Sequence, residues 1–268
     1  MSLREFLAAP KNTRTREHMF FNRLYYDLKV ASARRGNPLS IFQPDVDRDG
    51  YDVVINDGDY ERRFQLKSYL RDAATSSWKI GKGLLRPDPA YSEWLNLNLP
   101  LCGYGGGVVL IEIDASSSEP SVEYLFTDYL VILGFSIRMW LEASSPAPRR
   151  GKLAQLRAEL ARGFLHDIWL GDRQDKIVVP RKCFLRAKST DALLAMIGMH
   201  NTTGCHLPGD GVAQTFSKGF EAGSTGAPRA GLDVVTIGIA HAHARAFLEL
   251  ANEPELRVFT SGLAIDTP

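Results

Sequence analysis

The chain has 268 residues, of which 44% are hydrophobic and 24% charged, and its formal net charge is +1. This content is sufficient for a full buried core, and the near-zero charge excludes a protein that is basic throughout and coats nucleic acid by charge alone. No segment has the run of apolar residues that spans a bilayer, and the polar N-terminus lacks the apolar core of a signal peptide, so we expect a soluble cytoplasmic protein.

The first predicted element is a long amphipathic helix over residues 13–35. Its apolar residues recur at three- and four-residue steps, and Gly36 with Pro38 ends the helical pattern. Glu17 lies on the same stripe, where a carboxylate is unfavourable unless it is paired or near a metal. The alternative is a solvated first turn, in which an acidic residue simply favours the helix dipole.

A β-hairpin is predicted next. Residues 53–55 form a β-branched run typical of a buried strand, and residues 64–67 alternate apolar and polar side chains on a second strand. The dipeptide Asp57-Gly58 between them favours a hairpin turn. An ordinary hairpin with one polar face would show the same alternation.

Three polar groups of this hairpin have the chemistry of metal-assisted phosphodiester cleavage. Asp52 precedes the first strand, while Gln65 and Lys67 share one face of the second strand. Mg²⁺ prefers oxygen ligands and keeps several waters, so one carboxylate and one amide oxygen suffice beside a backbone carbonyl and a phosphate. The lysine ammonium would supply fixed positive charge where negative charge grows in the reaction.

The order of these features resembles the PD-(D/E)XK nuclease superfamily. The chain has a helix carrying Glu, then D-G-x-D before an apolar run, then a strand with Q-x-K. It is similar to the variant in which Gln replaces an acidic residue, as in Mrr-like nucleases and relatives of archaeal Holliday-junction resolvases. The resemblance implies an α/β fold of the restriction-endonuclease-like type, with a mixed central β-sheet flanked by helices.

The resemblance also implies a role for each site residue. Asp52 becomes the metal-binding aspartate, Gln65 the second metal ligand and Lys67 the catalytic lysine. Glu17 becomes the helix carboxylate that orients the site or binds the metal through water. Glutamine in place of an acid removes one negative charge from the site, which predicts weaker affinity for a hard cation.

Later elements continue the alternation of strands and helices that is typical of a mixed α/β sheet. We predict strands at 78–80, 108–113, 122–126, 177–180 and 183–185, and helices at 88–97, 129–141, 152–162 and 190–199.

We divide the chain into a nuclease-like domain over residues 1–200, a linker or irregular segment over 201–231, and a C-terminal extension of unknown role over 232–268. Gly, Ser, Thr and Pro dominate the second segment, and residues 232–250 suggest a helix. The three cysteines are scattered and odd in number, which indicates free thiols: Cys102, Cys183 and Cys205.

These features predict a metal-dependent endonuclease, using Mg²⁺ or Mn²⁺, that hydrolyses DNA in defence against foreign DNA or in repair. Its expected partners are DNA or RNA, and a second copy or other proteins of a defence system, with no membrane. The alternative is a nuclease-like domain that has lost catalysis and works as a nucleic-acid-binding or assembly module. A small-molecule α/β enzyme is disfavoured, because the chain has no cofactor fingerprint or nucleophile elbow.

Overall fold

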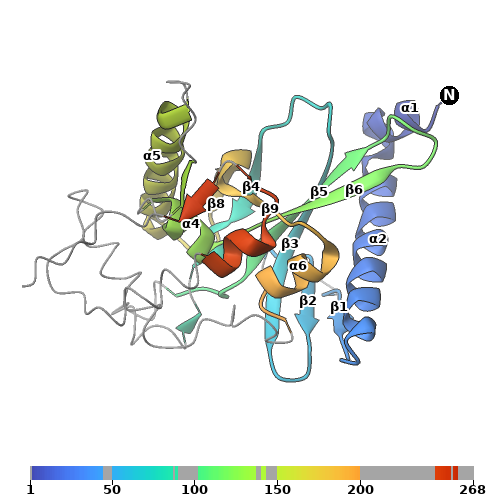
Figure 1. Ribbon diagram of the computed structural model, residues 1–268, viewed down its shortest axis with the longest axis horizontal. Helices are drawn as coiled ribbons and strands as arrows, with labels where there is room; N and C mark the ends of the chain where they lie inside the picture. Colours follow the sequence, from blue (N-terminus) through green and yellow to red (C-terminus); the bar gives the residue numbers. More distant parts are fainter. Residues whose placement is uncertain are drawn as a thin grey trace, which may run out of the picture.

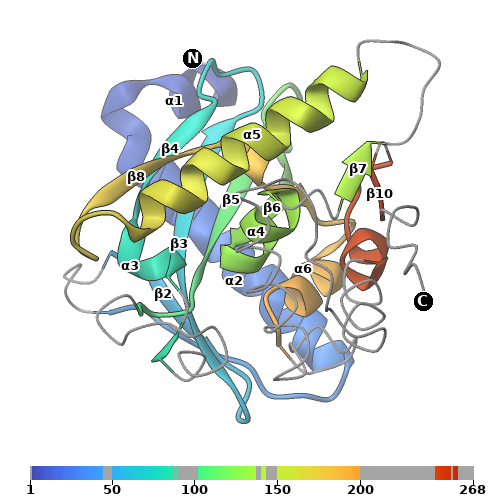
Figure 2. The same ribbon diagram turned by 90° about the vertical axis from the view of Figure 1, so that its left-hand side faces the viewer.

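The computed structural model describes residues 2–44, 50–86, 88–89, 102–136, 140–142, 150–199, 245–254 and 256–258. Within these ranges a central sheet of six strands, in the order β1-β2-β3-β5-β6-β9, lies between two layers that contain helices (Figures 1 and 2). The predicted mixed α/β sheet flanked by helices is therefore confirmed. In the described part of the chain, no helix is long and apolar enough to cross a membrane.

The central sheet mixes antiparallel and parallel pairs. Three strands follow one another as antiparallel neighbours: β1 (Ser40–Phe42), β2 (Val53–Asn56) and β3 (Glu61–Leu70). β3 then pairs in parallel with β5 (Gly107–Asp114), and the sheet ends with antiparallel β6 (Ser121–Asp128) and β9 (Leu185–Arg186). A parallel pair needs a crossover connection, which here contains β4 (Ser77–Gly81) and α3 (Lys82–Leu85).

Helix α2 (Thr13–Arg34) covers one face of this sheet. Its bounds confirm the predicted helix to within one residue, and Gly36 follows with a φ of 72° that suits a helix C-terminus. The predicted stripe is buried at Phe20, Leu24 and Leu28. Two shorter helices, α1 (Leu3–Ala8) and α6 (Thr190–Met196), pack against α2.

The strand register shows which residues of β3 face α2. Tyr124 of β6 donates a hydrogen bond of 2.7 Å to Asp27 of α2. Tyr124 is paired with Ile111 of β5, which is paired in turn with Ser68 of β3. Since side chains alternate along a strand, Ser68 and Leu66 face α2, whereas their neighbours in β3 face the other layer.

The other layer consists of the ribbon of β4 and β8 (Lys176–Pro180), α3, α4 (Tyr129–Ser136) and α5 (Arg150–Trp169) (Figure 2). Tyr69 of β3 contacts Trp78 of β4, with ring centroids 5.1 Å apart. The buried Arg86 donates to the carbonyls of Ile168 and Gly171, and so satisfies acceptors at the end of α5.

Two predicted elements differ from the structure, and a third falls almost entirely outside the described residues. The helix predicted over 129–141 stops at Ser136, and β7 (Trp140–Glu142) follows and pairs with β10 (Leu256–Val258). Apolar periodicity alone does not separate such a buried helix from a buried strand. A 3-10 turn, η4 (Arg181–Cys183), occupies part of the strand predicted over 183–185, and the helix predicted over 88–97 lies almost entirely outside the described residues.

The described part of the predicted C-terminal extension packs against the first predicted domain. Residues 245–250 are helical, and Phe247 packs on Trp140 with ring centroids 6.3 Å apart. Asn252 N–H donates to the Arg186 carbonyl at 2.7 Å. Residues 245–254 and 256–258 therefore share a core with the preceding elements, through Phe247, Ala251 and Leu256. The linker predicted over 201–231 lies outside the described residues.

Candidate functional site

The predicted hairpin of β2 and β3 is present. Val53 pairs with Phe64 in an antiparallel register, and the turn is closed by a hydrogen bond of 3.1 Å from Asp57 N–H to the Tyr60 carbonyl. Gly58 has a φ of 98°, a conformation that favours glycine. The hairpin brings Asp52 beside the strand that carries Gln65 and Lys67.

Asp52 lies where β2 begins, and its carboxylate bonds to the backbone of β3. Oδ2 accepts a hydrogen bond of 2.6 Å from Leu66 N–H, and Asp52 N–H donates to the Phe64 carbonyl at 2.9 Å. The carboxylate therefore lies in the sheet beside β3, next to the residue between Gln65 and Lys67. On the helix side, burial raises the pKa of Tyr25, and the negative charge of Asp52 adds to that shift.

Gln65 has a buried amide oxygen without a partner in the part of the chain that the structure describes. The residue is only 6% exposed, and its Oε1 has no hydrogen-bond partner among the described residues. A buried acceptor left unsatisfied costs about 1–3 kcal/mol, so such an atom calls for a water or a cation. Lys67 follows on the same face of β3, is half-buried, and forms no hydrogen bond or ion pair within the described part of the chain.

The structure does not bring Glu17 to this group. Glu17 is half-buried on α2, as its place on the apolar stripe predicts. However, α2 covers the face of the sheet opposite to Gln65 and Lys67, so the sheet lies between them (Figure 2). The expectation that Glu17 completes the site with these two residues is corrected accordingly.

The remaining donor set fits a hard divalent cation with few protein ligands. Asp52 offers a carboxylate and Gln65 an unpartnered amide oxygen, both of the type that Mg²⁺ and Mn²⁺ accept. No group of three or more Asp, Glu, His or Cys side chains converges among the described residues. Of the predicted site residues on this hairpin, Asp52 supplies the one carboxylate that a cation here would use. The loop of residues 45–49 before the hairpin lies outside the described residues.

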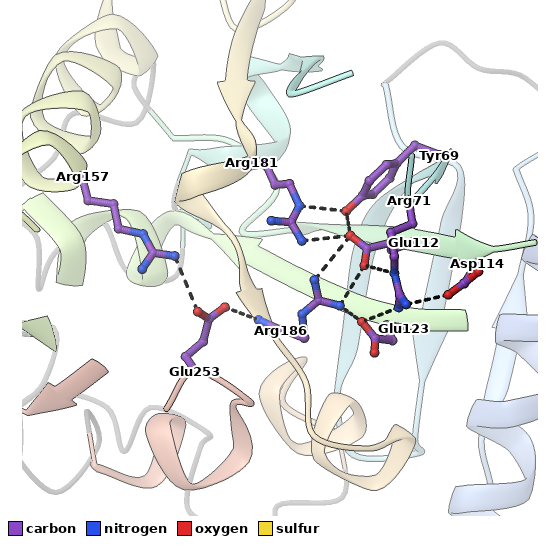
Figure 3. A network of polar contacts seen from close by, with 9 residues as sticks. All are labelled: Tyr69, Arg71, Glu112, Asp114, Glu123, Arg157, Arg181, Arg186 and Glu253. Atoms are coloured by element: carbon purple, nitrogen blue, oxygen red, sulfur yellow. Dashed lines mark hydrogen bonds and ion pairs between the residues drawn. The ribbon is translucent and has the colours of Figure 1, made fainter. Parts of the chain in front are cut away.

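A second polar cluster surrounds Glu112 of β5, at the far end of the same sheet face (Figure 3). Glu112 is 4% exposed and accepts hydrogen bonds from the Tyr69 hydroxyl and from three arginines, Arg71, Arg181 and Arg186, at 2.9–3.0 Å for the arginines. Burial alone would raise the pKa of Glu112, but the Tyr69 hydrogen bond and the arginine charges outweigh it and hold the pKa below its usual value.

This cluster was not predicted from the sequence. The one signal is a carboxylate inside the apolar strand predicted over 108–113, which is unfavourable unless it is paired. Its partners come from β3 and the residue after it, from η4 and from β9, far along the chain, so no local spacing identifies them.

Comparison of the chain with family models, with curated proteins and with solved structures finds no match in any of the three.

Proposed function

We propose that the chain is a metal-dependent endonuclease of restriction-endonuclease-like fold that hydrolyses DNA phosphodiester bonds. The observation that carries the proposal is the buried, unpartnered oxygen of Gln65 beside the amide to which Asp52 bonds. A buried amide oxygen without a protein partner, on the strand to which an aspartate bonds, is a suitable ligand for a divalent cation. The fold supports the proposal, because a helix, a hairpin and a parallel crossover are arranged around a mixed sheet as the resemblance implies.

In this proposal each residue of the hairpin has a distinct role. Asp52 and Gln65 would hold the cation, which when bound supplies Lewis-acid stabilisation of the phosphate charge. Lys67 lies two residues after Gln65 on the same face of β3. Its positive charge would orient water and offset the negative charge that develops on the phosphate oxygens. The Leu66 N–H fixes the Asp52 carboxylate against β3, so the two metal-binding groups are held on a rigid strand pair.

Aromatic residues next to Asp52 support a nucleic-acid substrate. The guanidinium of Arg63 lies 5.7 Å from the ring centroid of Tyr51 and 5.8 Å from that of Tyr104. The two rings are themselves 5.9 Å apart. Aromatic and arginine side chains beside a cleavage centre are suited to stacking on unpaired bases.

A second candidate function is a nuclease-like binding or assembly module without catalysis. The bond from Leu66 N–H to Asp52 favours it, because a carboxylate that completes the hydrogen bonding of β3 has a structural reason to be present. The glutamine at position 65 favours it too, since it lacks the charge of the commoner acidic ligand.

The substitution Asp52→Asn separates the two functions. Asparagine retains an oxygen that accepts from Leu66 N–H, so the hairpin should keep its stability, but the charge that attracts the cation is lost. We expect Mg²⁺-dependent cleavage of linear, circular or branched DNA to fall at least about a hundredfold, with an unchanged melting temperature. Gln65→Glu should retain or raise activity at low Mg²⁺.

The control for this experiment is Glu17→Gln, which removes a carboxylate from the opposite face of the sheet and should leave cleavage within about twofold of wild type. If wild type cleaves no DNA or RNA with Mg²⁺ or Mn²⁺, the module without catalysis is the better account. If Asp52→Asn cleaves as fast as wild type, the cleavage belongs to another site.

A further inference from the structure

The arginines around Glu112 line an open pocket of about 620 Å³. Its walls come from the end of β3 and the turn after it, from β5 and β6, from the turn after β8, from β9, and from the C-terminal segment. They are mostly polar: Tyr69, Arg71, Ala73, Thr75, Glu112, Glu123, Arg181, Arg186, Asn252 and Pro254. A pocket assembled from so many separate segments, with a charged group at its base, is suited to a polar ligand rather than an apolar one.

Glu112 fixes the direction of the three guanidinium groups (Figure 3). Its two oxygens accept hydrogen bonds from Nε of Arg71, from Nη2 of Arg181 and from both Nη atoms of Arg186. Nε of Arg181 also donates to the Tyr69 hydroxyl at 2.9 Å, while its Nη1 has no partner among the described residues. Donors held in this way lose little side-chain entropy when a ligand arrives.

The arginines of the pocket are opposed by three carboxylates. Glu112 and Glu123 belong to the lining, and Asp114 pairs with Arg71 at 2.7 Å; only Glu112 is buried among them. The side chain of Arg181 is 40% exposed, and its Nη1 is the donor left over for a ligand in the described part of the chain, whereas each nitrogen of Arg71 already contacts a carboxylate. Glu123 is the carboxylate at the rim, where it pairs with Arg71 at 3.0 Å and with Arg186.

We propose that this pocket binds a phosphate group of a nucleic-acid strand, outside the cleavage centre. The choice of a nucleic acid as the source of the phosphate rests on the proposed nuclease function. Arginine forks that converge from three elements match the several oxygens of a phosphate, and Thr75 and Asn252 offer further polar groups. Tyr69 shares a strand face with Lys67 and lies about 7 Å further along β3, so one strand of nucleic acid spans the pocket and the cleavage centre.

The proposal is tested by binding, in the full chain carrying Lys67→Ala so that no cleavage occurs. Fluorescence anisotropy measures the affinity for single-stranded oligonucleotides with a 5′-phosphate or a 5′-hydroxyl, and inorganic phosphate is added as a competitor. In this background Arg181→Gln should weaken binding about tenfold, the effect of one lost charged hydrogen bond. Glu123→Gln should tighten binding, because it releases donors of Arg71 and Arg186; a misfolded variant does not bind more tightly.

Arg23→Gln is the matched control, because Arg23 is an exposed residue of α2 that pairs with Asp27, and α2 lies on the other side of the sheet from the pocket. It should change the affinity less than twofold. A loss confined to the 5′-phosphorylated strand supports a terminal phosphate as the ligand, and an equal loss for both strands supports an internal phosphate. Equal oligonucleotide affinities of the Arg181→Gln and Arg23→Gln proteins would overturn the proposal. So would a protein that binds inorganic phosphate but whose affinity for the oligonucleotide does not change with Arg181→Gln.

This outcome is independent of cleavage. If the protein with Lys67 intact never cleaves, yet Arg181→Gln weakens binding, the nuclease function is refuted and the phosphate pocket is supported. If the protein with Lys67 intact cleaves, yet Arg181→Gln leaves binding unchanged, the phosphate pocket is refuted and the nuclease function is supported.

Discussion

Lys67→Ala should lower Mg²⁺-dependent cleavage by at least about a hundredfold, the loss expected when a preorganised positive charge is removed from a reaction centre. Folding and DNA binding should stay close to wild type, because Lys67 is half-buried and has no hydrogen bond or ion pair with other described residues. The measurement is phosphodiester turnover over a range of Mg²⁺ and Mn²⁺ concentrations, with melting temperature and DNA affinity measured on the same samples.

Lys79→Ala provides the control for that experiment. Lys79 is an exposed lysine on the neighbouring ribbon strand β4, so its loss removes the same charge without touching the hairpin face. It should cleave at the wild-type rate. Equal turnover by wild type and Lys67→Ala would mean that the hairpin is not the cleavage centre.

Glu112→Gln should lower the free energy of unfolding at pH 7 by roughly 2–4 kcal/mol, because it leaves three arginines without their shared carboxylate. The effect lies at the low end of that for buried ion pairs, since Arg71 and Arg181 are partly solvated and water replaces some of the lost interaction. Chemical denaturation of both proteins at several pH values measures it, with the exposed Glu119→Gln as a control.

The difference should depend on pH with a defined sign. The pKa of Glu112 is held below its usual value of 4.5, so the stabilisation is fully present above that value and disappears as pH falls through the lowered pKa. Wild type and Glu112→Gln should thus converge in stability in acid and differ most near neutral pH. Equal stability at pH 7 would show that the arginines do not need this carboxylate in the folded state.

Local patterns predicted the elements nearest the site. The helical stripe ends at Gly36, and the turn at Asp57-Gly58 fixes the hairpin, because each depends on neighbours in the sequence. The same stripe indicates the half-buried side of α2 that carries Glu17. It does not say which residues of β3 face α2, because the register of β3 against β5 and β6 is set by long-range pairing.

The arginine pocket depends entirely on such long-range pairing. Glu112 is visible in the sequence as an acid in an apolar strand, but its three arginines are brought to it by the crossover after β3, by the turn after β8, and by the return of β9 to the sheet. Its outer wall is added by the C-terminal segment, through Asn252 and Pro254. Sequence periodicity carries no information on contacts of this kind.

The central claim, that the Gln65 oxygen faces a divalent cation, is tested most directly by the thermal stability of wild type and Gln65→Leu with and without Mn²⁺. Without metal, Gln65→Leu should melt at a higher temperature, since it replaces a buried, unpartnered oxygen with an apolar side chain of similar size. With Mn²⁺ at about 100 times its dissociation constant, wild type should gain about 2.7 kcal/mol by binding, whereas Gln65→Leu should gain much less. A wild-type protein that Mn²⁺ does not stabilise, or a Gln65→Leu protein that it stabilises equally, would contradict the metal site.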